Sequence, residues 1–415
     1  MKVDTVNFHC QRCAESSEWR INMDICKQVY GESQAYFDGK TCGYTAQEIA
    51  HQPAMWRALC EVLRSNRQAI DNFMASVGPL RDMRVIMTGA GSSGFTGKAV
   101  AGFVTHNSGI LCEAVHTTDI VSAPESVLAA DKPTMLISFA RSGNSPESDG
   151  AVRYARKIVK NLYEVAIVCD GTSKLSKTTR ESDKSLVLVM PEGTNDKGFA
   201  MTSSVSTMAM AGFALFNANK TDEIVADYLR LADVVEAGAP AMAKDAKLCA
   251  GWGFERLWCL ASGPLTALAS EGALKMMELT NGAVLAGHNN SAEFRHGPKT
   301  MLNPKTLTLH FVSNVPFTAQ YDLDLLNQLY HEREGNKVVA LHNKAEKVQA
   351  DLAIPYSVHG FGFAADICAG MQGLVFMQML SMFMSLALGI TTDNPSPSGL
   401  VNRVVQGVTV YDYVI

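Results

Sequence analysis

The chain has 415 residues, of which 47% are hydrophobic and 19% are charged, and its formal net charge is −5. This composition is typical of a well-buried globular protein, and the length suits two domains of ordinary size. The negative net charge argues against non-specific nucleic-acid binding, which requires a basic surface. An anionic ligand would therefore have to be held locally, by backbone amides and helix ends.

Residues 1–43 show no clear periodicity and are predicted to be an N-terminal extension. The chain has ten cysteines, and its first residues contain no apolar segment of the kind found in a secretory signal. A reducing cytoplasm is therefore the expected compartment. An H-C-x-x-C string beginning at His9 could start a zinc site, but Cys26 and Cys42 lack metal-ligand spacing. We therefore predict no metal site.

The next segment, residues 44–220, is predicted to form a first α/β domain. Repeated strand and helix patterns imply a parallel sheet covered by helices on both faces, a doubly wound, flavodoxin-like fold. The predicted strands cover residues 84–88, 111–115, 134–139, 165–169 and 186–190. The first of them runs into a G-x-G-x-x-G string, but no acidic residue closes the strand after it. NAD binding is therefore not expected.

Two turns rich in hydroxyl groups follow the first and third of these strands. Ser92 and Ser93 open one helix, and Ser142 and Ser145 lead into another whose first residue is proline. Free amides at such turns bind phosphate, and Arg141 adds a fork-shaped donor suited to a dianion. The alternative is an ordinary capped helix with Ser145 as its cap. Two such turns in one half favour a phosphate site.

Residues 221–390 repeat the pattern and are predicted to form a second domain, with strands at 256–260, 306–311 and 338–341. The segment 369–390 carries no charge and is long enough to cross a bilayer. Glutamine and serine interrupt it and no Lys or Arg flanks it, which favours a buried helix. Residues 391–415 form a tail that ends in a strand-like pattern at 408–411.

One segment, residues 271–299, concentrates charge in a chain that has little of it. Glu271, Lys275 and Glu278 have the spacing that places them on one stripe of a helix. Asn281-Gly282 ends that helix, and the string EFRHGPK follows at 293–299. On pattern alone, a surface helix with a Glu-Lys pair and a satisfied histidine explains the segment equally well.

The strings EGALKMME and EFRHGP resemble the catalytic signature of sugar isomerase (SIS) domains. Longer strings resemble the tagatose-6-phosphate ketose/aldose isomerase group, also described as galactosamine-6-phosphate deaminases: SFARSGNSPES, GFAMTSS, EFRHGPK, QYDLDLL and SGLVNRVVQGV. The resemblance runs from about Thr45 to the C-terminus. It implies two tandem SIS domains of α/β class, each with a parallel sheet flanked by helices.

The resemblance also implies roles for individual residues. Glu278 matches the carboxylate that moves the sugar proton, His296 the histidine of ring opening, and Lys275 the lysine beside them. The implied phosphate contacts are Ser92, Ser93, Arg141, Ser142 and Ser145. The implied sugar contacts are Thr202, Ser203, Glu293, Arg295 and Gln406. Glutamine at 406 stands where glucosamine-6-phosphate synthase has a lysine, which excludes a Schiff base at this position.

The expected function is an amino-sugar-phosphate deaminase that converts galactosamine 6-phosphate to tagatose 6-phosphate and ammonia through an enolamine, without a cofactor. Two alternatives remain: an aldose–ketose isomerase of a hexose 6-phosphate without deamination, and a non-catalytic sugar-phosphate-binding regulator. The resemblance further implies a homodimer or tetramer in which His296 reaches a neighbour's active site. No nucleic acid or membrane partner is expected.

Overall fold

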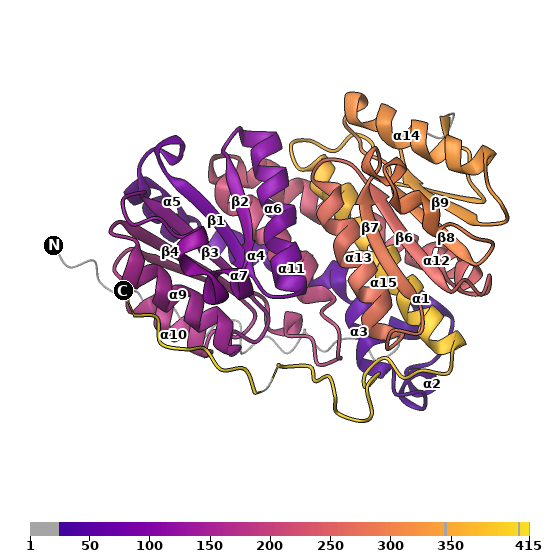
Figure 1. The fold of residues 1–415 in the computed structure, drawn as a ribbon, viewed down its shortest axis with the longest axis horizontal. Coiled ribbons are helices and arrows are strands. Elements are labelled where there is room, and N and C mark those ends of the chain that lie inside the picture. The colour runs from indigo at the N-terminus through magenta and orange to yellow at the C-terminus, as the bar shows by residue number, and fades with distance from the viewer. Residues whose placement is uncertain (1–24, 344–346, 406, 415) are drawn as a thin grey trace.

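The computed structural model describes residues 25–343, 347–405 and 407–414. Figure 1 shows two α/β halves beside one another, each built on one sheet. In the first half, five strands pair in parallel in the order β2-β1-β3-β4-β5. Their bounds are β1 Arg84–Gly89, β2 Cys112–His116, β3 Thr134–Ala140, β4 Leu162–Val168 and β5 Ser185–Val189. The five strands predicted for this half are confirmed.

The second sheet repeats the arrangement of the first. Read from β7, its parallel strands follow the order β7-β6-β8-β9-β10. Their bounds are β6 Arg256–Ala261, β7 Leu285–Asn290, β8 Thr306–Phe311, β9 Lys337–His342 and β10 Leu352–Pro355. The three strands predicted here are confirmed, and β7 and β10 are additional. β7 has the largely polar sequence LAGHNN, and β10 is apolar but has only four residues, so neither stands out in the sequence as a strand.

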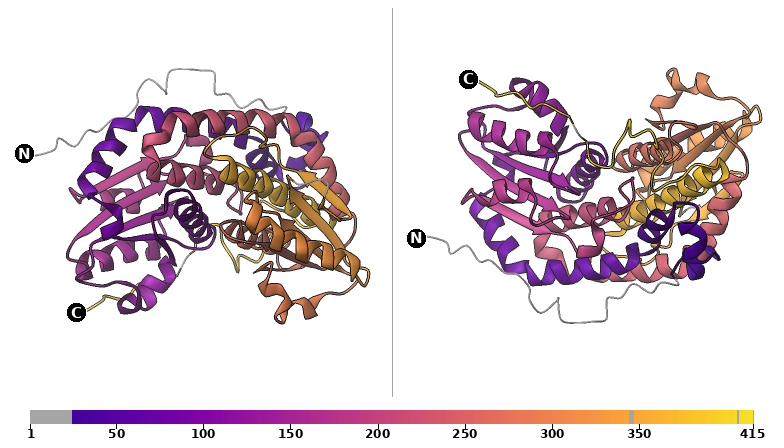
Figure 2. Two further views of the ribbon diagram at one scale, coloured as in Figure 1. Left: turned by 90° about the horizontal axis from the view of Figure 1, so that it is seen from above. Right: turned by 90° about the horizontal axis from the view of Figure 1, so that it is seen from below.

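Helices pack on both faces of each sheet (Figures 1 and 2). The helices of the first half are α3 Gly43–Ala50, α4 Gln52–Ser65, α5 Arg67–Val77, α6 Ser92–Ser108, α7 Thr117–Ser122, α8 Pro124–Val127, α9 Pro146–Ile158, α10 Lys174–Arg180 and α11 Ser203–Phe216. Those of the second half are α12 Thr221–Ala250, α13 Leu265–Leu279, α14 Pro316–His331 and α15 Ala365–Ala387. Val85 and Met87 of β1 face the central core and Ile86 faces an outer cluster, as the two-residue period of a strand requires.

One hydrophobic core joins the two halves. It includes buried residues of α4 and α11 from the first half and of α12, α13 and α15 from the second. The long helix α12 begins at Thr221, next to the domain boundary predicted at residue 220. Because the core continues across that boundary, the division into residues 44–220 and 221–390 stays a prediction.

The uncharged segment near the C-terminus forms α15, as predicted. Among the described helices, α15 is the one whose length and composition would allow it to cross a membrane, and its most apolar 18-residue window is wholly buried inside the protein. Its apolar surface is therefore used within the fold, against α12 and α13.

The C-terminal tail runs from the second half back across the first (Figures 1 and 2). Tyr154 of α9 donates its hydroxyl to the carbonyl of Tyr411, and Lys157 Nζ donates to the carbonyl of Tyr413 at 2.9 Å. Tyr413 Oη donates to Glu125 Oε1 at 2.6 Å. The predicted strand at 408–411 is wrong, because this segment pairs with no strand and instead lies against α9 through side-chain hydrogen bonds.

The described part of the N-terminal extension forms two short helices, α1 Ile25–Tyr30 and α2 Gln34–Asp38. α1 packs on α12, where Lys247 Nζ donates to the carbonyl of Tyr30 at 2.6 Å. The H-C-x-x-C string at His9 lies outside the described residues. Within the described ranges, no group of three or more His, Cys, Asp or Glu is arranged to hold a metal ion.

Candidate active site

Three charged side chains of α13 meet the first half of the molecule. The helix follows Gly263, which has φ of +59°, and it ends before Asn281 and Gly282, which both have positive φ. Lys275 Nζ forms ion pairs with Glu271 Oε1 at 3.2 Å and with Glu278 Oε2. It also donates to Ser92 Oγ, at the start of α6, at 2.9 Å. The predicted stripe therefore faces the other half rather than solvent.

Burial separates the roles that these three side chains can take. The side chains of Lys275 and Glu271 are 0% and 1% exposed, whereas that of Glu278 is 28% exposed. Glu278 is therefore the one carboxylate of the cluster that a small molecule can reach. A proton acceptor must touch the atom that it deprotonates, so this exposure fits a base.

The charges of the cluster support one another. Burial lowers the pKa of Lys275, but Glu271 and Glu278 outweigh it and leave that pKa above its ordinary value. Lys275 is therefore an ammonium ion at neutral pH. Burial raises the pKa of Glu271 to about 7, although Lys275 opposes the shift. Glu271 was not among the predicted site residues, and a carboxyl group of this kind can hold or release a proton near neutral pH.

The two hydroxyl-rich turns lie at the carboxyl ends of β1 and β3. Because neighbouring parallel strands end at the same edge of a sheet, Ser92 and Ser93 share this edge with Ser142 and Ser145. The turn after β3 requires glycine at 143, where φ is +61° and an added Cβ would lie 2.4 Å from Ser173 Oγ. The turn therefore lies close to Ser173, the residue that caps the start of α10.

Ser145 also caps a helix, which was the alternative role considered for it in the sequence. Its hydroxyl accepts a hydrogen bond from the backbone N–H of Ser148 at 3.4 Å, which caps α9. Ser142 Oγ accepts from the backbone N–H of Asn144 at 3.4 Å. Capping and anion binding do not exclude each other, since a hydroxyl oxygen that accepts one bond still has a proton to donate.

Arg141 is buried beside these turns. Its Nη1 donates to the carbonyl of Phe199 at 3.3 Å, and its Nη2 donates to the carbonyl of Arg403 in the tail at 2.7 Å. Burial and the nearby charge of Arg403 lower the pKa of Arg141, while Asp196 and Glu278 are close enough to oppose that shift. The predicted phosphate residue and the predicted base therefore lie within electrostatic reach of one another.

Two of the predicted sugar contacts are engaged within the protein. The hydroxyls of Thr202 and Ser203 donate to Asp196 Oδ1 at 3.0 and 2.6 Å. Asp196 is fully buried and also accepts the backbone N–H groups of residues 202–204, so it caps α11. Sugar binding by Thr202 and Ser203 stays a prediction. Gln406, also predicted to bind sugar, lies outside the described residues.

The remaining predicted residues lie on the loop after β7, in two short helical turns, η4 Glu293–Arg295 and η5 Pro298–Met301. His296 is exposed between them. Glu293 is exposed and accepts from Asn289 Nδ2 at 3.0 Å, a bond that lowers its pKa, with His288 and His296 contributing. Among the described residues, no hydrogen bond or ion pair joins His296 to Lys275 or Glu278. The structure therefore brings Lys275, Glu278 and Ser92 together, with Arg141 close by, and leaves His296 apart.

Arg295 points to a neighbouring helix. Its Nε donates to Gln328 Oε1 and its Nη2 to Asp324 Oδ2 of α14, both at 2.7 Å.

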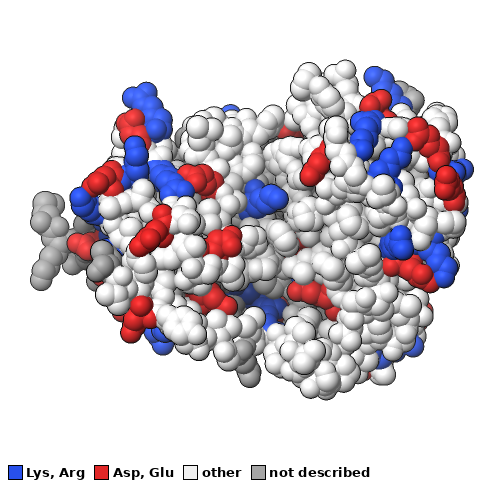
Figure 3. All heavy atoms as spheres, viewed as in Figure 1, with Lys and Arg blue, Asp and Glu red and all other residues white. Residues whose placement is uncertain are grey.

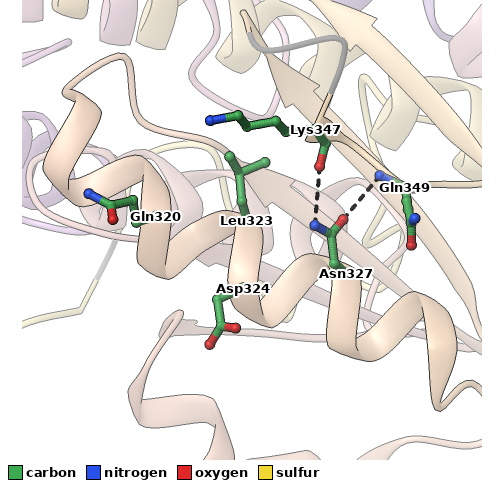
Figure 4. Close-up of a pocket in the computed structure, with 6 residues that line it drawn as sticks. All are labelled: Gln320, Leu323, Asp324, Asn327, Lys347 and Gln349. Atoms are coloured by element: carbon green, nitrogen blue, oxygen red, sulfur yellow. Dashed lines mark hydrogen bonds between the residues drawn. The ribbon is translucent and has the colours of Figure 1, made fainter.

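Asp324 also lines a surface pocket of about 440 Å³ (Figure 4). At that pocket the side chain of Asn327 donates to the carbonyl of Lys347 and accepts from the backbone N–H of Gln349, both at 3.1 Å. None of the predicted site residues lines it. Figure 3 instead shows a hollow between the two halves, with acidic and basic side chains in it.

Known proteins resemble this chain over most of its length. The SIS domain model matches residues 81–218. A D-galactosamine-6-phosphate deaminase AgaS from Escherichia coli is 36% identical, over 89% of this chain and 96% of the relative. The chain belongs to the SIS domain family. A second AgaS protein, from a Shewanella species, is 35% identical over 89% of this chain and 92% of the relative.

A solved structure shows the same resemblance at the level of the fold. The tagatose-6-phosphate ketose/aldose isomerase from Escherichia coli matches with a TM-score of 0.81 and 33% identity, and the match covers 89% of this chain and 96% of that one. The predicted fold class, two tandem parallel sheets flanked by helices as in paired SIS domains, is confirmed.

Proposed function

We propose that this protein is a deaminase of galactosamine 6-phosphate, with aldose–ketose isomerase chemistry, that forms tagatose 6-phosphate and ammonia. The observation that carries the proposal is Glu278, a reachable carboxylate in a buried charge cluster that touches Ser92 of the hydroxyl-rich turns. Proton transfer on a phosphorylated sugar requires a base beside an anion site. The names of the relatives supply the substrate, and they support the galacto epimer.

In this proposal the first half anchors the phosphate group. The residues that would hold it are Ser92, Ser93, Arg141, Ser142 and Ser145. The binding energy of the phosphate orients C1 and C2 of the sugar against Glu278, because remote binding can be used for positioning. Glu293, Arg295 and the turn at Thr202 and Ser203 would border the sugar.

The second half carries the proton transfers. His296 assists ring opening, and the free aldehyde acidifies the hydrogen on C2. Glu278 removes that proton and returns it to C1 through an enolamine, and the positive charge of Lys275, buried behind Glu278, favours the developing oxyanion without touching it. The product carries a ketimine at C2. Water adds to this carbon and ammonia leaves, so one water is consumed for each ammonia released.

A second candidate is a plain aldose–ketose isomerase that acts on tagatose 6-phosphate. The name of the solved Escherichia coli structure favours it. The same proton transfer by Glu278 would serve, without loss of nitrogen.

We also propose a reducing, cytoplasmic location, because the eight cysteines of the described residues are all free thiols. Neither proposal uses a cofactor or a metal.

An ammonia-coupled assay separates these functions. We expect ammonia from galactosamine 6-phosphate, slower release from glucosamine 6-phosphate, and almost none from galactosamine without its phosphate. A plain isomerase would release no ammonia but would interconvert galactose 6-phosphate and tagatose 6-phosphate. If the protein binds these sugar phosphates and turns over none of them, it is a sugar-phosphate-binding regulator and the proposal is wrong.

Replacing Arg141 by alanine should raise KM for the phosphorylated sugar by about 10–100-fold, the size of one charge-assisted hydrogen bond to a dianion, with a smaller change in kcat. The contact exists in the ground state and the transition state alike. The matched control is Arg153→Ala, which removes a partly exposed guanidinium of α9 that pairs with Asp149. An unchanged KM in the Arg141 variant would assign this residue to the fold alone.

A further inference from the structure

Helix α14 carries the string QYDLDLL, which the proposed chemistry does not use. Within it, Asp322 is fully buried. Its Oδ1 accepts hydrogen bonds from Ser262 Oγ and Ser291 Oγ, both at 2.6 Å, and its Oδ2 accepts from the backbone N–H of Ser313 at 3.0 Å. A buried carboxylate needs such donors, since it has lost its water. Three hydrogen bonds converge on this one side chain.

The three donors mark the carboxyl ends of three adjacent strands. Ser262 directly follows β6, Ser291 directly follows β7, and Ser313 lies two residues beyond β8. The first half of the molecule uses the corresponding edge of its own sheet for the Ser92 and Ser142 turns. In the second half, a carboxylate of the chain itself takes up the donors at this edge.

Two of these serines, Ser262 and Ser291, begin the segments that carry the proposed proton-transfer groups. Ser262 leads through Gly263 into α13, which bears Lys275 and Glu278. Ser291 begins the loop that bears His296. Asp322 is therefore hydrogen-bonded to the first residue of each segment.

Further contacts along α14 hold the same loop. Phe294 is fully buried in a cluster that includes Leu323 and Leu326 of the helix. Arg295 bonds to Asp324 and Gln328 of α14, and Lys299 pairs with Glu332 just after the end of the helix. Ser291, Phe294 and Arg295 thus attach the loop to α14, and Lys299 attaches it to the residue that follows the helix.

We propose that Asp322 is a positioning residue that fixes the start of α13 and the start of the His296 loop relative to each other. The reaction depends on how Glu278 and His296 are oriented, and a displacement of about 1 Å at such groups can cost about 100-fold in rate. The kinetic part of this inference rests on the proposed function. The structural part, that Asp322 holds the loop in place, does not rest on the proposed function.

The test compares Asp322→Asn with Asp227→Asn. Asp227 is a matched control, since it is a buried carboxylate of α12 that accepts backbone hydrogen bonds from Gly362 and Ala364 at 2.8 and 2.9 Å. We expect both variants to lower the unfolding temperature. Only Asp322→Asn should lower kcat, by about 100-fold, with KM for galactosamine 6-phosphate little changed. Only this variant should speed hydrogen exchange of the amides in residues 291–299.

A gentler pair of variants keeps the test decisive if Asp322→Asn does not fold. Ser291→Ala removes one hydrogen bond to Asp322, whereas Ser313→Ala keeps its bond, which comes from the backbone. We expect faster exchange in the loop and a lower kcat with Ser291→Ala alone. The inference would be overturned if the two members of each pair changed kcat and hydrogen exchange equally. It would also be overturned if hydrogen exchange in the loop did not change. Absence of ammonia release by the unmodified protein would refute the proposed function, and hydrogen exchange would still decide the role of Asp322.

Discussion

Replacing Glu278 by glutamine should lower kcat for ammonia release by about 10²–10⁴-fold or more, which is the usual cost of removing a general base. Substrate binding should survive, because the phosphate turns lie on the other half of the molecule. The cluster should also survive. A glutamine side chain retains an oxygen that can accept from Lys275, and Lys275 keeps its ion pair with Glu271.

The measurement is kcat and KM for ammonia release, together with direct binding of the substrate to the variant. Glu255→Gln is the control, since Glu255 is an exposed carboxylate of the same half whose ion pair, with Lys305, lies away from the cluster. We expect the control to keep full activity. If Glu278→Gln retains near-normal turnover, the assignment of the base is wrong.

Local sequence spacing was sufficient to predict the stripe of charged side chains on α13. Glu271, Lys275 and Glu278 follow helical spacing, and the ion pairs between them are contacts across one turn of a helix. Their partner in the other half was not predictable in this way. Ser92 lies 183 residues away, and the hydrogen bond to Lys275 exists only because α6 and α13 pack together.

Long-range partners also explain what the sequence did not show about the predicted contacts. Hydroxyls at Thr202 and Ser203 and a guanidinium at Arg295 are the right groups for binding a sugar, and sequence alone shows only the type of group. The structure shows that Asp196 accepts from the first two and that Asp324 accepts from the third. Strand β7 was missed because it is an edge strand with a largely polar sequence, in which Ala286 is the one buried residue.

The second large effect concerns assembly. We predict a homodimer, or a tetramer of dimers, in which His296 serves the Glu278 site of a second subunit. His296 is exposed, and among the described residues it forms no bond to the cluster of its own chain. Pro298 lies two residues beyond it and begins the turn η5, and contacts with α14 hold the loop on the second half. An exposed histidine on a fixed loop is available to a neighbouring molecule.

The experiment mixes two inactive variants, Glu278→Gln and His296→Ala, and allows their subunits to exchange. If sites are shared, each hybrid dimer has one site with both residues intact and one site with neither. Random exchange makes about half of the dimers hybrids, so about one quarter of full activity should return, as two-fold symmetry requires. Light scattering and exchange of labelled subunits establish that hybrids form. Hybrids without activity would place His296 in its own subunit's site.

The matched control carries both substitutions in one chain and is mixed with the unmodified protein. If sites are shared, every site of a hybrid lacks one residue, and only the unmodified dimers, about one quarter of the total, remain active. If each subunit builds its own site, hybrids keep one working site and about half of the activity remains. Shared sites therefore give about one quarter of full activity in both mixtures, whereas separate sites give none in the first mixture and about half in the second. Sharing predicts recovery in the first and a steeper loss in the second, and no change in protein stability alone produces both results.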